Sequence, residues 1–392
     1  MRTQPLLNRR HFLKTAALAG GALALHRLSP VDAAPLTTTS QVSLTAGNDH
    51  VDIIFQGLQR FKKQIAAAIG NRPILVKPNC VIGTSNNGHG DVLLSDTPVD
   101  CLEAILEFLA SIGKTDVLIA EACATDPTMV AFANNNYFSL LRKFPVRFKD
   151  LNEEGYETRL VWNTNASAST PLQQVRISKM LLNPDYFVIS AAKAKTHNYV
   201  IATLSLKNIV MASPVIDANR FRNTGNWQND KGYMHSASGN NASGGGNNSQ
   251  DLNDNLVRLG AQLAPDLSVI DCYQGMQGTG PCLGTAVNQR AAIVSLDWLA
   301  ADRVGVELMD INAGIVSRGY SNNSGFNWPR YPAYLSYAGQ LGMGQYDLSK
   351  IEVLGETIAS RKMTYGLGTA YISDTSSIAS QVNMALNPRI AA

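Results

Sequence analysis

The most informative absences in this 392-residue chain are the short motifs of well-known enzyme classes. No two of its five cysteines form a Cys-x-x-Cys pair, which excludes ferredoxin and zinc-ribbon sites. Its six histidines form no His-x-x-x-His or His-Glu pair, which excludes a zincin-type protease. No Gly-x-Ser-x-Gly elbow supports a serine hydrolase. The chemistry must therefore be sought in a less familiar arrangement of side chains.

The sequence also lacks a long apolar run and a strong excess of charge. Beyond the first 34 residues no segment is long and apolar enough to span a membrane, so we expect no permanent membrane span. Removing residues 1–33 takes away five basic residues and one acidic residue, so 33 − 5 = 28 basic residues face 30 − 1 = 29 acidic ones. A net charge of −1 gives no sign of nucleic-acid binding.

The N-terminus reads as an export signal. Asn8-Arg-Arg-His-Phe-Leu-Lys14 is a twin-arginine motif, and Thr15–Leu25 is an apolar stretch too short to span a bilayer. Small residues at Ala33 and Ala34 suit cleavage by signal peptidase. We therefore predict a signal peptide over residues 1–34, transient contact with the twin-arginine translocase, and a periplasmic or otherwise extracytoplasmic location.

The remaining chain alternates apolar strands with helical stretches. Strands are predicted at Pro73–Pro78, Asp116–Ala120 and Val146–Asp150, and a helix is expected to begin at Pro98 and to end at Gly113. Further strands are predicted at Tyr186–Ser190, Leu267–Asp271, Ala291–Ser295 and Ile351–Leu354, and a hairpin at Thr158–Trp162 and Gln174–Ile177. This order predicts an α/β fold with a mostly parallel sheet flanked by helices, an extra hairpin and a loop-rich C-terminal elaboration.

The domain organisation follows from the same pattern. Residues 50–310 are expected to form the α/β domain, and residues 311–392 a C-terminal extension that packs on it. The Gly/Asn/Ser-rich stretch from Ser236 to Asn253 is too polar to fold alone and is expected to be a mobile surface loop, placed to act as a lid.

Polar side chains follow several of the predicted strands. Lys77 and Asn79 close the first, Glu121 the second, Lys195 and His197 follow the Tyr186 strand, and Asp271 ends the Leu267 strand. In parallel sheets such groups gather at the carboxyl edge, where ligands bind. If these side chains converge on one rim, the carboxyl edge of the sheet, they form a site. The alternative is that each strand end is solvated separately.

Lys193–Asn208 is the densest of these segments, with three lysines, His197 and Asn208. Lys207 lies in an apolar stretch, so its amine either reaches solvent or is buried with a lowered pKa. In the second case it would serve as a base, a nucleophile or a cofactor anchor. A solvated loop with chance charges remains the simpler interpretation of this segment.

The cysteines and glycines leave further alternatives. Cys80, Cys123 and Cys272 follow strands and could hold a soft metal, but in an exported protein one disulfide, Cys80–Cys123 or Cys272–Cys282, is favoured. Gly275–Pro281 lacks the order of a nucleotide-binding loop, so we expect a tight turn there whose backbone at Gly278 and Gly280 approaches a ligand.

Several of these pieces, in this order, resemble the domain-of-unknown-function 362 family. They are Ile74–Asn79, Thr97-Pro98, Lys193–Asn208, Pro265–Asp271, Met276–Pro281 with Gly284, and Ser295–Asp302. The resemblance implies a redox role, since members of that family often carry ferredoxin-type iron–sulfur modules. This chain lacks the cysteines of such modules, and Cys272 replaces the glycine that usually follows the aspartate.

A weaker similarity concerns spacing alone. His197 and Lys207 are ten residues apart, which is similar to a histidine and a cofactor-linking lysine of the nickel-pincer lactate racemase group. The residues around the lysine differ. The similarity implies an anchor role for Lys207 and a base or ligand role for His197 or His235.

The sequence thus supports two hypotheses. The first is an exported enzyme that binds a small anionic substrate or a cofactor of unidentified kind, with redox and metal-dependent chemistry both left open. Its candidate catalytic residues are His197, Lys207, Lys195 and Asp271, with His197 as general acid/base or metal ligand oriented by Asp271 or Glu121. Its candidate ligand-binding residues are Lys77, Asn79, Asn208, Gly278 and Gly280. The alternative is a non-catalytic ligand-binding protein of the cell envelope that uses the same rim.

Overall fold

The computed structural model describes residues 38–85, 90–163, 172–222, 227–236, 249–311 and 333–367. The predicted leader lies outside these residues, as does most of the segment predicted as a lid. The described end of that segment differs from the prediction, because a helix begins at Ser249 instead of Asn253.

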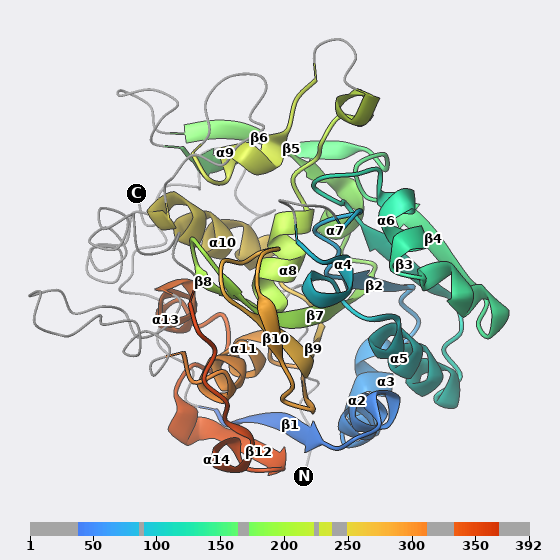
Figure 1. Ribbon diagram of the computed structural model, residues 1–392, viewed down its shortest axis with the longest axis vertical. Coiled ribbons are helices and arrows are strands. Elements are labelled where there is room, and N and C mark those ends of the chain that lie inside the picture. The colour runs from blue at the N-terminus through green and yellow to red at the C-terminus, as the bar shows by residue number, and fades with distance from the viewer. Residues whose placement is uncertain are drawn as a thin grey trace, which may run out of the picture.

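Within the described residues, ten strands form one mixed sheet (Figure 1). Its main path runs β12-β1-β11-β9-β7-β2-β3-β4, while β10 pairs with β9 and β8 with β7. The strands are β1 (Ser40–Ala46), β2 (Ile74–Pro78), β3 (Val117–Glu121), β4 (Val146–Asp150), β7 (Phe187–His197), β8 (Ile201–Thr203), β9 (Leu267–Gln277), β10 (Thr285–Val287), β11 (Ala291–Ser295) and β12 (Ile351–Gly355). Pairing is parallel from β9 to β4 and between β12 and β1, so the predicted α/β fold with a mostly parallel sheet is confirmed.

Helices cover both faces of the sheet (Figure 1). One face carries α2 (His50–Gln59), α3 (Lys62–Ile69), α5 (Val99–Ser111), α6 (Thr128–Asn134) and the 3-10 helix η1 (Tyr137–Arg142). The other carries α7 (Lys179–Leu182), α8 (Ser205–Ala212), α10 (Ser249–Leu263), α11 (Trp298–Leu308) and α13 (Ala333–Gln340). Shorter elements are α4 (Val92–Ser95), η2 (Ala218–Arg222), α9 (Asp230–Tyr233), η4 (Leu348–Lys350) and α14 (Ile358–Arg361). Two separate apolar cores result, one on each side of the sheet.

The predicted strand–helix–strand unit is present in β2, α5 and β3. Pro98 precedes α5 with extended backbone, and Gly113, just after the helix, has a positive φ of 72° that suits glycine. Ile74 pairs with Val117 in parallel register, so both strands present their carboxyl ends at the same edge. The predicted hairpin is also confirmed, as β5 (Tyr156–Trp162) and β6 (Leu172–Ser178) form an antiparallel two-stranded sheet.

Strand β7 is longer than the sequence suggested. The segment Lys193–His197, expected in a loop past the strand, is the second half of β7 and pairs with β8 and β9. It remains extended because β8 folds back on it and β9 continues beside it, with a register shift between Lys193 and Lys195. All eleven residues of β7 are buried, so the solvated-loop interpretation is wrong.

The part of the C-terminal extension that is described, residues 333–367, contributes to the same sheet. β12 pairs with β1 along Ser40–Leu44, and Gly278 donates its N–H to the carbonyl of Gly366 at 2.8 Å. β1 itself was not predicted, because a seven-residue strand with only two large apolar side chains gives a weak pattern.

Candidate functional site

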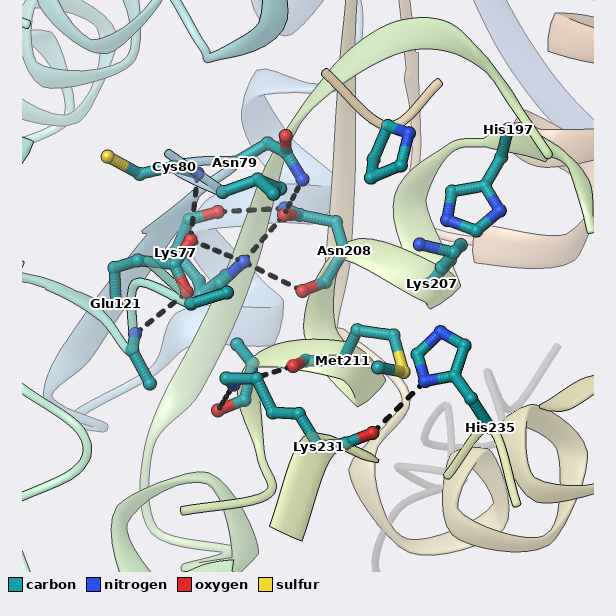
Figure 2. Close-up of a pocket in the computed structure, with 15 residues that line it drawn as sticks. Lys77, Asn79, Cys80, Glu121, His197, Lys207, Asn208, Met211, Lys231 and His235 are labelled. Carbon is teal, nitrogen blue, oxygen red and sulfur yellow. Dashed lines mark hydrogen bonds and ion pairs between the residues drawn. The ribbon is translucent and has the colours of Figure 1, made fainter. Parts of the chain in front are cut away.

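A cavity of about 150 Å³ lies at the carboxyl ends of β2, β3 and β7 (Figure 2). This volume is well above the space needed for a single ordered water. Its wall includes Lys77, Asn79, Cys80, Glu121, His197, Lys207, Asn208, Met211, Lys231 and His235. The predicted edge of the sheet therefore holds a concave site, as parallel sheets usually do.

One side of the cavity is a closed ionic network around Lys77. The ammonium group lies 2.7 Å from Glu121 Oε2 and donates to both the carbonyl and the side-chain oxygen of Asn208, each at 2.7 Å. A lysine has three donors, so none is left for a ligand. Asn79 Nδ2 also donates to Asn208 Oδ1, at 3.1 Å. Lys77, predicted to bind a ligand, here contacts Glu121 and α8 instead, whereas Asn79 holds α8 through Nδ2 and has no hydrogen-bond partner for its Oδ1 among the described residues.

Glu121 is equally occupied. Besides Lys77 it accepts the backbone N–H groups of Cys80 at 2.9 Å and of Ala122 at 2.8 Å. Lys77 and Glu121 are each about 2 % exposed, so their charges face each other in a protein interior. Burial lowers the pKa of Lys77, and the charge of Glu121 opposes that shift.

Two further lysines in the cavity wall form no ion pair with a carboxylate among the described residues. Lys207, on α8, is 5 % exposed, and burial together with the charge of Lys195 lowers its pKa to about 7. Lys231, on α9, donates to the carbonyls of Met211 at 2.7 Å and Ala212 at 3.3 Å, and burial lowers its pKa to about 8. The carbonyls that Lys231 contacts are at the C-terminal end of α8, where a cation is favoured.

His197 is held as a hydrogen-bond donor. Its Nδ1 accepts the backbone N–H groups of Tyr199 at 3.1 Å and Val200 at 3.4 Å. A nitrogen that accepts two N–H groups carries no proton, so the neutral ring has its proton on Nε2. Burial and the neighbouring charge of Lys207 lower the pKa of His197 well below 6.5. The ring can donate a hydrogen bond to a ligand, which differs from the acid–base role expected from the sequence.

His235 has the opposite arrangement. Its Nδ1 lies 3.1 Å from the carbonyl of Lys231, an acceptor, so Nδ1 carries the proton and Nε2 the lone pair. Burial lowers the pKa of His235 to about 4. Figure 2 shows the two histidines on either side of the Lys207 side chain. The cavity therefore combines a neutral donor, a neutral proton acceptor and an amine.

Asp271 lies on the other face of the sheet, which corrects the prediction that it orients His197. Lys77 pairs with Ser190, whereas Asp271 pairs with Lys193, which is three residues further along β7. Because successive side chains of a strand alternate between the two faces of the sheet, a spacing of three residues puts Lys77 and Asp271 on opposite faces. Asp271 Oδ1 lies 3.1 Å from Nε2 of His50, and Oδ2 lies 3.7 Å from Lys193 Nζ.

His50, at the start of α2, completes this second cluster. Its Nδ1 lies 3.4 Å from Asp100, and its ring stacks on Tyr273 with centroids 4.3 Å apart. Burial disfavours the charged ring, but the two carboxylates outweigh it and raise the pKa of His50 to about 9. A doubly paired imidazolium of this kind is a structural cation.

The remaining predicted residues lie at the edge of the cavity or behind it. Lys195 is buried and donates to the carbonyl of Ser95 at 2.7 Å, and burial lowers its pKa. Gly278 accepts a hydrogen bond from Thr196 Oγ1 at 2.8 Å. A Cβ on Gly280 would lie 1.7 Å from the carbonyl oxygen of Thr196. Both glycines thus allow close approach of two backbones, in place of the predicted approach to a ligand.

All five cysteines are free, so the expected disulfide is wrong. Cys272 is buried on β9 next to the Asp271 cluster, and Cys80 and Cys123 contact each other as thiols at the ends of β2 and β3. Burial raises the pKa of the Cys80 thiol well above its usual value, which makes it a poor nucleophile. Within the described ranges, no three His, Cys, Asp or Glu side chains are grouped to hold a metal ion.

The structure brings Lys77, Asn79, Glu121, His197, Lys207 and Asn208 together and leaves Asp271 apart. Sequence analysis missed Lys231 entirely and gave His235 only a minor role. Lys231 lies in α9 and His235 follows it by two residues, and a helix of four residues is too short to produce a periodic pattern.

Comparison with known proteins identifies relatives but no activity. The chain is 22 % identical over 243 residues to a thylakoid-associated protein of Synechocystis sp., an alignment that covers 62 % of this chain and 64 % of that protein. The chain thus matches less than two thirds of that relative's length. No solved structure matches the chain. The described helices include none that is long and apolar enough to cross a membrane.

The family model named domain of unknown function DUF362 matches residues 74–307, more than half of the chain. This span runs from β2 to α11 and contains every residue of the cavity described above. The protein is therefore a member of the DUF362 family.

Proposed function

We propose that this protein is an exported enzyme whose cavity binds a small anionic substrate or cofactor. The observation that carries the proposal is an imbalance of charge. Of the residues that line the cavity, Glu121 is the one acidic side chain, and Lys77 with two backbone N–H groups occupies it. Among the described residues neither Lys207 nor Lys231 forms an ion pair with a carboxylate, although the charge of Glu121 acts on Lys231, so a carboxylate or phosphate group would supply the missing negative charge.

The two neutral histidines of the cavity support a chemical reaction in addition to ligand binding. The buried His197 offers an N–H donor, and the partly buried His235 offers a proton acceptor. A neutral imidazole can polarise a carbonyl group, and an acceptor nearby can take a proton. These two histidines give the site the parts of an acid–base enzyme.

Replacing Lys207 or Lys231 with methionine is expected to weaken anion binding about tenfold to a hundredfold, because each loss removes a charge-assisted hydrogen bond of about 1.5–3 kcal/mol. Inorganic phosphate, oxalate and glyoxylate serve as probes, and the shift of the melting temperature with probe concentration gives the affinity. Lys62→Met, at an exposed lysine of α3, is the matched control and should behave as wild type. Equal affinity in all four proteins would disprove the proposal.

The same measurement has a predicted pH dependence. An anion binds best when both lysines are protonated, and their pKa values of about 7 and 8 in the empty cavity mean that affinity falls as the pH rises from 6 to 9. Binding above pH 7 must then be accompanied by proton uptake, which calorimetry in buffers of different ionisation enthalpy detects. Binding without any turnover of candidate substrates would favour the non-catalytic envelope protein.

Export is the part of the proposal that rests on the sequence alone. Changing Arg9 and Arg10 together to lysine is expected to leave an uncleaved precursor inside the cell, because the translocase reads the arginine pair. Cell fractionation and the mass of the purified N-terminus test this, and the wild type should begin at Ala34 or Pro35. An unchanged distribution and mass in the variant would rule out the twin-arginine route.

A further inference from the structure

Lys207 differs from every other lysine around the cavity. Lys77 makes three polar contacts, Lys195 donates to Ser95, and Lys231 donates to two carbonyls at the end of α8. In the described part of the chain, the Lys207 amine has neither a hydrogen bond nor a carboxylate partner, although it is 5 % exposed. A buried lysine that holds a helix or a sheet in place would be expected to have such partners.

The groups around Lys207 fit one kind of reaction. A carbonyl carbon placed at its amine would have His197 Nε2–H available for the carbonyl oxygen and His235 Nε2 available for a proton. Lys231 would hold an anionic group on the same small molecule. These positions describe a carbonyl compound that carries a carboxylate, and the cavity limits it to a few carbon atoms.

We infer that Lys207 forms an imine with a small 2-oxo acid bound in this cavity, an inference that rests on the proposed function and names its substrate class. The Lys207 nitrogen attacks the carbonyl carbon while His197 Nε2–H donates a hydrogen bond to the oxygen. His235 Nε2 takes one proton from the attached nitrogen and gives it to that oxygen, which becomes a hydroxyl group. His235 then carries the second proton of the nitrogen to the hydroxyl group, which leaves as water while the C=N bond forms. One carbonyl and one amine thus give one imine and one water, with no oxidant or reductant.

The protonation of Lys207 agrees with this role. Only an unprotonated amine attacks a carbonyl, and an ordinary lysine is almost wholly protonated near neutral pH. Burial and the charges of Lys195 and Lys77 lower the pKa of Lys207 to about 7, so a large share of the amine is free at physiological pH. Nucleophilic lysines in other enzymes are activated in the same two ways.

Trapping with sodium borohydride tests the inference directly. The purified full chain is incubated with pyruvate or with glyoxylate, reduced, and examined by intact mass and peptide mapping. We expect one reduced adduct per chain, located on Lys207, with competition by inorganic phosphate. Lys207→Met should lose the adduct, whereas Lys62→Met should keep it, and unfolded protein should show no preference for Lys207.

The possible outcomes distinguish imine formation on Lys207 from anion binding by the cavity. A melting shift with phosphate but no adduct on Lys207 from either oxo acid would overturn the imine and leave anion binding intact. Neither a shift nor an adduct would overturn both. Adducts scattered over surface lysines, with Lys207 unmodified, count against the imine in the same way. The yield of adduct in the wild type should rise between pH 6 and 8 as the amine loses its proton.

Discussion

Substitution of Asp271 by asparagine is expected to lower the free energy of unfolding by about 3–5 kcal/mol, the usual result of removing one partner of a buried ion pair. Asp271 and Lys193 are both fully buried, and their charged atoms lie 3.7 Å apart. Lys193 Nζ makes no hydrogen bond within the described residues, so the variant leaves a buried ammonium group without compensation. Of its two carboxylate partners, His50 would keep only Asp100.

Equilibrium unfolding in urea measures this effect, and Asp116→Asn is its control. Asp116 pairs with Arg147 at 2.6 Å, but both side chains are more than 60 % exposed. Exposed pairs contribute about 0–1 kcal/mol, so this variant should stay close to wild type. Similar losses in the two variants would show that the Asp271 cluster is not specially stabilising.

The pH dependence of the same cluster has a definite sign. Burial raises the pKa of Asp271, but Lys193 and His50 outweigh it and lower the pKa to about 2, so its contribution is present above pH 3.8 and is lost as the pH falls toward 2. The raised pKa of His50 acts in the other direction. Its contribution is complete below pH 6.5 and is lost as the pH rises through about 9. In the Asp271→Asn variant, the unfolding free energy should vary less with pH both near pH 2–4 and near pH 9.

The pair of Lys77 and Glu121 is expected to show the second large effect. Lys77→Met leaves a buried carboxylate with two backbone N–H donors, and Glu121→Gln leaves a buried ammonium with only the oxygens of Asn208. Each single change should cost about 3–5 kcal/mol in unfolding free energy. Because each single variant already carries the unpaired charge, the double variant should lose less than the sum of the two, by about 1–3 kcal/mol.

A double-mutant cycle from urea unfolding gives this coupling energy. The pair Lys143 and Glu103 offers a comparison in which the lysine is 57 % exposed. Its coupling should be below about 1 kcal/mol. Strict additivity at Lys77 and Glu121 would mean that their short contact contributes no net stability. Because both residues also support α8, a weakened anion affinity should accompany the loss of stability.

The sequence predicted the sheet better than it predicted the site. Runs such as Ile74–Pro78 and Val117–Glu121 are apolar, bounded and short, so their positions and parallel pairing could be inferred. The sequence could also place Lys77, Glu121 and His197 at one edge. It could not tell which face each side chain takes, because a face depends on register, and register depends on distant pairing. Asp271 was misplaced for this reason.

The roles of the histidines were also beyond the sequence. His197 is a donor because two backbone N–H groups of its own turn occupy Nδ1, and His235 is an acceptor because a carbonyl occupies its Nδ1. Identical side chains thus receive opposite roles from the local backbone. A pattern of residue types contains no information about either contact.

The place of β1 in the sheet has a consequence for biosynthesis. Its residues near position 40 pair with β11 and β12, and the hydrogen bond from Gln41 to Glu352 joins side chains 311 positions apart. The outer edge of the sheet is therefore complete only after nearly the whole chain has been synthesised. Until then the early strand exposes its edges to water and to other chains. We therefore expect the chain to mature slowly and to depend on chaperones, and we expect truncation before residue 351 to be severe, because it removes the partner of β1.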